Sequence, residues 1–155
     1  MRKAIPIVYI LLLYFLIAIL FYFQTDIKIG LVFIVIVIFG ILNVINAIAL
    51  YKEKKEKELK FSMCLTAFGS FPFLLTVFLF FSVIAVLASD YQYGLLQTYA
   101  IAAVFNGFVR ISCAFYGYFY AKLGELAKIH RILPFVPLLN VIDTIVVLIE
   151  ERKRI

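Results

Sequence analysis

Apolar residues are gathered along the chain into long runs that short polar segments separate. Four runs cover residues 4–23, 29–51, 61–89 and 95–120. At a rise of about 1.5 Å per residue, each run is long enough to cross a hydrocarbon layer roughly 30 Å thick. Residues 31–39 are rich in β-branched side chains, which favour strands in water. Lipid leaves the backbone of an isolated strand unsatisfied, so the pattern predicts four transmembrane helices.

The last third of the chain follows a different pattern. Residues 132–149 are mostly apolar but include Pro134, Pro137, Asn140 and Asp143. From Asn140 onward the polar positions recur at roughly helical spacing, which is typical of an amphipathic helix. The pattern predicts a C-terminal interfacial or re-entrant helical segment over 132–149. A fifth span is the alternative, and it would carry the basic C-terminus to the opposite side of the membrane.

Composition supports a membrane protein. Hydrophobic residues make up 66% of the 155 residues, whereas about 45–50% is usual for a soluble domain. The length allows one domain. The sequence therefore predicts an all-α, polytopic integral membrane helix bundle that forms a single membrane domain over residues 1–155.

The basic residues are distributed unevenly about the four predicted spans. The net charge is +6, and 13 of the 15 Lys and Arg residues fall at the N-terminus, between the second and third runs, or after the fourth. Basic residues near helix ends favour the cytoplasm, so both termini are predicted to be cytoplasmic. This surface would face anionic lipid, and nucleic acid is not an expected partner. The composition is typical of a bacterial cytoplasmic membrane protein.

An arginine within the fourth run is the main candidate for function. Arg110 lies about ten residues from the inner end of that run, where a charge costs roughly 2.5–3.5 kcal/mol on insertion scales. On a helix, Asn106 shares its face. One hypothesis is that Arg110 binds an anionic group or lines a polar pathway. The other is a structural arginine paired with Asp143 or with backbone carbonyls.

Other polar residues in the runs suggest packing. Asn43 and Asn46 form a polar stripe on the second helix, and asparagines hydrogen-bond across helix interfaces. Residues 69–72 contain Pro72 and predict a kink or break in the third helix. His130 is the single histidine and is predicted to be an exposed residue at the membrane edge.

No pattern of catalytic, cofactor-binding or metal-ligating residues is recognisable. Cys64 and Cys113 fall inside apolar runs and are predicted to be free, buried thiols. Intramembrane catalysis needs a nucleophile with a base, or two carboxylates. An intramembrane enzyme is therefore the least favoured class.

Two function classes remain. The first is a non-enzymatic accessory or interaction subunit of a membrane complex, a class that includes small immunity-type proteins. The second is a homo-oligomeric transporter or channel for a polar or anionic solute, with a route lined by Arg110, Asn106 and Asn43. The partner is another membrane protein in the first case and a second copy of the chain in the other.

Overall fold

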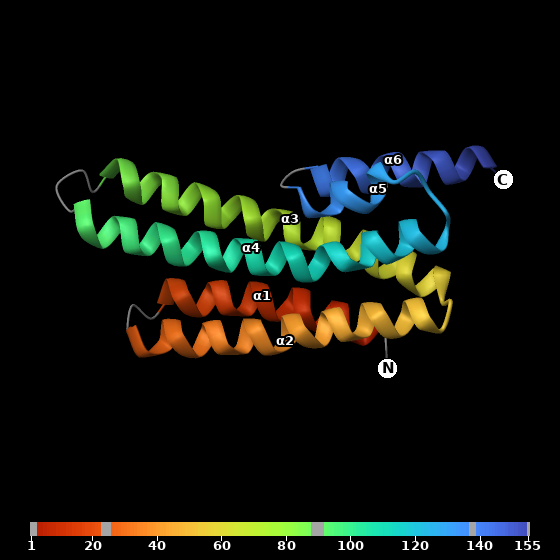
Figure 1. Ribbon diagram of the computed structural model, residues 1–155. Coiled ribbons are helices and arrows are strands. Elements are labelled where there is room, and N and C mark those ends of the chain that lie inside the picture. Colours follow the sequence, from red (N-terminus) through yellow and green to blue (C-terminus); the bar gives the residue numbers. More distant parts are fainter. Residues whose placement is uncertain (1–2, 23–25, 88–91, 137–138, 155) are drawn as a thin grey trace.

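The computed structural model describes residues 3–22, 26–87, 92–136 and 139–154, and every regular element in these ranges is helical (Figure 1). The elements in chain order are α1 (Ala4–Tyr22), α2 (Asp26–Lys52), α3 (Glu56–Leu87), α4 (Gln92–Leu123), α5 (Ile129–Ile132), the 3-10 turn η1 (Leu133–Phe135) and α6 (Leu139–Arg154). The predicted all-α fold is confirmed. The bounds of the four long helices lie within about five residues of the four apolar runs.

The four long helices run side by side, and the C-terminal elements cover part of one pair. α1 and α4 each pack against α2 and α3, while α5 and η1 contact α4 and α6 contacts α3 and α4. In Figure 1, α5 and α6 run in opposite directions beside the half of α3 and α4 that holds the α2–α3 turn. We term α5, η1 and α6 the C-terminal hairpin.

Both chain ends lie toward the end of the bundle that carries the α2–α3 turn (Figure 1). We term this end the basic end, because it gathers basic residues of several elements: Lys52, Lys54, Lys55, Lys57, Lys60, Lys122 and Arg152. The common location of the N-terminus, the α2–α3 turn and the C-terminus is the arrangement that an even number of long helices produces.

Two helices at the basic end stop through the same backbone motif. After α2, the Lys55 amide donates to the Leu50 carbonyl and Lys54 has a φ of 52°. After α4, the Leu126 amide donates to the Ala121 carbonyl and Glu125 has a φ of 50°. These are the six-to-one hydrogen bonds of Schellman motifs, which satisfy the last carbonyls of a helix. Non-glycine residues take the left-handed position in both turns.

Helix α3 continues through Pro72 rather than breaking there. Proline removes one backbone donor and crowds the preceding turn. In the turns before it, Thr66 donates its hydroxyl to the Ser62 carbonyl at 2.8 Å, and Ser70 donates to the Thr66 carbonyl. A break at residues 69–72 is therefore absent, and the described helix is continuous through this stretch.

The described surface of α1 and α2 is apolar, while asparagines are buried. Asn43 and Asn46 are buried in α2, whereas Ile38 and Ile45 of the same helix are more than half exposed. The part of α2 from Ile34 to Lys52 is long and apolar enough to cross a membrane, and it is the one such helix among the residues whose side chains the structure describes. One helix of this kind is weak evidence of membrane association.

Candidate functional site

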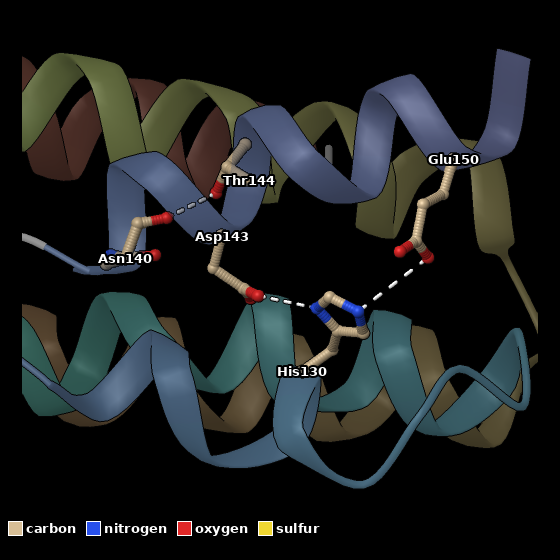
Figure 2. A network of polar contacts seen from close by, with 5 residues as sticks. All are labelled: His130, Asn140, Asp143, Thr144 and Glu150. Atoms are coloured by element: carbon tan, nitrogen blue, oxygen red, sulfur yellow. Dashed lines mark hydrogen bonds and ion pairs between the residues drawn. The ribbon is translucent and has the colours of Figure 1, made fainter.

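A buried histidine and aspartate join the two arms of the C-terminal hairpin (Figure 2). The Nδ1 atom of His130 in α5 lies 2.6 Å from the Oδ1 atom of Asp143 in α6. The side chains are 6% and 4% exposed. An ionised carboxylate can only accept a hydrogen bond, so Nδ1 is the donor when Asp143 is ionised. This pair connects residues 13 positions apart in the sequence.

A second carboxylate lies on the other side of the same ring. The Nε2 atom of His130 is 3.7 Å from Oε2 of Glu150, whose side chain is 43% exposed. Figure 2 shows the imidazole between Asp143 and Glu150, two turns apart on α6. Thr144, beside Asp143, donates its hydroxyl to the Asn140 carbonyl at 2.8 Å. The imidazole therefore meets one buried and one partly exposed carboxylate.

Aromatic and proline side chains hold the hairpin against α4. The ring of Phe135 in η1 meets Phe115 edge-on, with centroids 5.5 Å apart, and lies 6.1 Å from the ring of Tyr118. Pro134 is buried against Gly117 of α4. A Cβ atom at position 117 would lie 3.0 Å from Cγ of Pro134, which is tighter than most real contacts. Glycine is needed there because η1 approaches the α4 backbone so closely.

Substituting Gly117 is expected to displace η1 from α4. Gly117→Leu adds a side chain where the rigid ring of Pro134 lies, and overpacking of this kind costs about 1–3 kcal/mol. Gly107→Leu in the same helix is the matched control, because its added Cβ meets no atom within 4 Å apart from the adjacent backbone of α4 and its chain neighbours. Limited trypsin digestion in detergent measures the effect at Arg131 in α5. We expect faster cleavage there in Gly117→Leu than in Gly107→Leu, and equal rates would contradict the packing described.

The end of α6 is tied to α3 and α4 at the basic end. Lys60 of α3 forms an ion pair with Glu151 of α6, and Tyr120 of α4 donates its hydroxyl to the same carboxylate at 2.9 Å. The hydrogen bond from Lys60 holds the pKa of Glu151 below its usual range. Because both charged side chains are about one-third exposed, solvent screens this pair and its contribution to stability is small.

A second group of buried polar residues lies between α1, α2 and α4, and we term it the polar seam: Tyr9, Asn43, Asn46, Ser112 and Tyr116. The Tyr116 hydroxyl donates to Oδ1 of Asn43 at 2.8 Å and accepts from Nδ2 of Asn46 at 2.8 Å. Asn43 also donates to the Ser112 carbonyl at 3.3 Å, and the Ser112 hydroxyl lies 3.0 Å from that of Tyr9. These bonds join three helices through polar groups that all lie inside the bundle.

The structure brings together part of the predicted polar site. Asn43 and Asn46 hydrogen-bond to α4, as an asparagine stripe at a helix interface would. Their partners on α4 are Ser112 and Tyr116. Arg110 is half-buried, between buried Val109 and exposed Ile111, and lies outside the polar seam. Asn106 lies within α4, and its side chain is outside the described residues.

Two expectations about the C-terminal segment need correction. His130 is 5% exposed and is not the exposed edge residue that its basic neighbours suggested. Asp143 is buried as well, and the partner that satisfies its carboxyl is His130 rather than Arg110. The fold-back of α6 onto α5 explains both results, because it brings a histidine next to an aspartate in a site shielded from water.

The interactions at these sites are hydrogen bonds and close contacts between ionisable groups. Cys64 is half-buried and Cys113 is buried, and both are free thiols as predicted. Within the described residues, no three His, Cys, Asp or Glu side chains gather in a way that could hold a metal ion. Thr144, the hydroxyl nearest to Asp143 in the sequence, bonds a backbone carbonyl and is not aimed at the histidine.

Searches of known protein families, of curated proteins and of solved structures give no match to this chain. The functional assignment therefore rests on the physical character of the sites.

Proposed function

We propose that this chain is an integral membrane protein of four spanning helices that serves as a non-enzymatic accessory subunit of a membrane complex. Its basic end would lie in the cytoplasm, where clustered Lys and Arg residues meet anionic lipid. The single observation that carries the membrane assignment is the polarity of the described helices. Asn43, Asn46 and Asp143 are buried, while isoleucines cover the outer faces of α2 and α6.

Such polarity is unfavourable in water and favourable in lipid. Exposed apolar surface of this extent marks contact with a membrane or another protein. Within lipid, polar side chains are costly unless they face the protein interior and find partners. The described outer face of α2 fits this environment, since Ile34, Ile38, Ile41, Leu42 and Ile45 are all at least 44% exposed.

The polar seam favours the accessory class over the transporter class. Tyr116, Asn43 and Ser112 bond one another or the α4 backbone, and these bonds hold α2 against α4. A solute path would need polar groups turned toward a channel rather than toward each other. The character of the seam therefore supports a role in interhelical packing.

A homo-oligomeric transporter remains a second candidate because of Arg110. Its side chain is partly exposed on a span of α4 where the next residue, Ile111, is 51% exposed. In both candidates a neighbouring subunit would cover the exposed side of Arg110. That neighbour is a second copy of this chain in the transporter class and a different protein in the accessory class.

Arg110→Gln, combined with native mass measurement, separates the two candidates. The unaltered protein is extracted gently from its own membrane in lipid nanodiscs, and the particle is weighed and its subunits identified. We expect a stoichiometric second protein, and we expect Arg110→Gln to fold normally and release it. A pure homo-oligomer whose Arg110→Gln variant folds but loses solute flux in liposomes would instead establish transport.

A further inference from the structure

The outward face of the C-terminal hairpin is a stripe of branched apolar side chains. On α6 the exposed apolar positions follow a helical spacing of three or four residues, and three further branched apolar residues are exposed before α6: Ile142, Ile145, Val146 and Ile149, with Ile129, Ile132 and Val136. Ile132 is 65% exposed. The inward face of α6 carries Asp143, Thr144 and Val147, all buried.

This arrangement reverses what a helix lying on a membrane surface requires. An interfacial helix turns its apolar face toward the acyl chains and its polar face toward water. In α6 the polar residues Asp143 and Thr144 turn into the protein, and every exposed position between Leu139 and Ile149 is apolar. Such a helix has apolar surroundings along its outer side and protein along its inner side.

The length and charge of the hairpin set how deeply it reaches. The stretch of α6 from Leu139 to Ile149 spans roughly 16 Å at about 1.5 Å per residue, near half of a hydrocarbon layer about 30 Å thick. Between residues 132 and 149 the single charged residue is Asp143, whereas charges resume at Glu150. Figure 1 shows α5 and α6 beside one half of the bundle only.

We infer that the C-terminal hairpin is a re-entrant element that enters the bilayer from the basic end and places its isoleucine stripe against the acyl chains of that leaflet. This inference rests on the proposed membrane bundle. The hairpin crosses half of the hydrocarbon layer and returns, so Lys128 and Arg152 stay on the side where they began. The stripe is apolar, as are the exposed faces of α1 and α2, which lie in the same lipid.

The buried pair makes this insertion possible. An aspartate in lipid is costly unless it faces protein and has a partner. His130 supplies that partner at 2.6 Å, on the inward side of the hairpin, so that α6 carries Asp143 into the leaflet without presenting it to acyl chains. Glu150 and Glu151 lie where α6 leaves the leaflet, and Glu151 pairs there with Lys60.

Tryptophan fluorescence gives a direct measurement of depth, because the chain contains no tryptophan. The full-length variants Ile142→Trp, Ile145→Trp and Ile149→Trp are each reconstituted in vesicles of phosphatidylcholine and phosphatidylglycerol with bromine at defined acyl positions. Seven residues of helix separate the outer pair, roughly 10 Å of rise. We expect the tryptophan at 142 to be quenched best by bromines near the ends of the acyl chains, at the bilayer centre. The tryptophan at 149 should be quenched best by bromines near the headgroups.

A second measurement separates a re-entrant hairpin from a fifth span. Arg152→Cys and Lys55→Cys are labelled with a membrane-impermeant maleimide from one side of sealed vesicles, with the unaltered protein as background for Cys64 and Cys113. Re-entry predicts that both engineered thiols react from the same side. Reaction from opposite sides would overturn the inference, as would equal shallow quenching at positions 142, 145 and 149.

Ile38→Trp on α2 distinguishes failure of this inference from failure of the proposed function. Ile38 is 51% exposed on α2, whose described part is long and apolar enough to cross a membrane. Quenching at position 38 with none at 142, 145 or 149 retains the membrane bundle and rejects the re-entrant hairpin. Absence of quenching at position 38 rejects both.

Discussion

Replacing His130 with alanine is expected to loosen the C-terminal hairpin by about 3–5 kcal/mol, the usual cost of leaving a buried carboxylate without its partner. The Asp143 carboxyl would remain in a site where it is 4% exposed and would lose its 2.6 Å hydrogen bond. Hydrogen exchange of the α6 amides measures the effect. At a factor of ten for about 1.4 kcal/mol, exchange should accelerate roughly a hundredfold to several-thousandfold.

Glu150→Gln is the matched control for the histidine contact. Glu150 lies 3.7 Å from the other ring nitrogen, and its side chain is 43% exposed, so water can replace the interaction. We expect the exchange of α6 in this variant to change by less than about tenfold, which corresponds to about 1.4 kcal/mol. An effect as large as that of His130→Ala would mean that Glu150, and not Asp143, is the residue that closes the hairpin.

The double variant His130→Leu with Asp143→Leu is expected to recover most of the lost stability. Replacing both members of a buried pair with well-packed apolar residues is often neutral or stabilising, because the desolvation cost of the charges disappears. Recovery would show that His130→Ala is destabilised by the unpaired carboxyl of Asp143. If the double variant exchanges as fast as His130→Ala, the lost packing of the imidazole ring is the cause instead.

The long helices were predictable because each apolar run is bounded by charges. The charged cluster between residues 52 and 60 separates α2 from α3. Within this cluster Glu53 pairs with Lys55 in the turn, whereas Lys60 pairs with Glu151 from the distant helix α6. Local spacing predicts neighbours on one helix, and it contains no information about a distant helix that competes for the same lysine.

The ends of helices were less predictable than their interiors. Lys54 and Glu125 take left-handed backbone conformations that usually indicate glycine or asparagine. Gly124 lies beside one of these positions without occupying it. The Schellman hydrogen bonds stabilise the turns, so a residue with an unfavourable intrinsic preference is tolerated there.

The candidate site was predicted in its parts but not in its pairing. The spacing of Asn43 and Asn46 indicated one interface, and they do share one. His130 was wrongly placed at the surface, because its neighbours Lys128 and Arg131 are basic and the fold-back of α6 depends on contacts 13 residues apart. The sequence did contain an indication of this pair, because the single histidine can hydrogen-bond to the single acid within residues 132–149.

Removing the Tyr116 hydroxyl is expected to destabilise the bundle by about 1–3 kcal/mol. Tyr116→Phe keeps the ring but deletes one hydrogen bond to Asn43 and one from Asn46. A buried polar group that loses its partner costs about 1–3 kcal/mol, and interhelical bonds in membranes average about 0.6 kcal/mol each. The free energy of unfolding is measured by detergent titration in mixed micelles.

Tyr118→Phe provides the matched control two residues away. Tyr118 is half-buried, and the contacts that engage it are ring contacts with Phe119 and Phe135, which phenylalanine preserves. We expect a change within about 0.5 kcal/mol, the usual range for a substitution away from buried polar groups. A loss equal to that of Tyr116→Phe would show that the assay reports a general intolerance of aromatic changes in α4.

A double-mutant cycle with Asn43→Leu then tests whether the polar seam acts as one unit. Because Tyr116 donates directly to Asn43, the two single losses should overlap, with a coupling of about 0.5–3 kcal/mol. Asn43→Leu removes the acceptor that Tyr116→Phe would otherwise leave unsatisfied, so the second substitution costs less than the first. Additive losses would mean that the two residues stabilise α2 and α4 separately, and the seam would then no longer explain how these helices find their register.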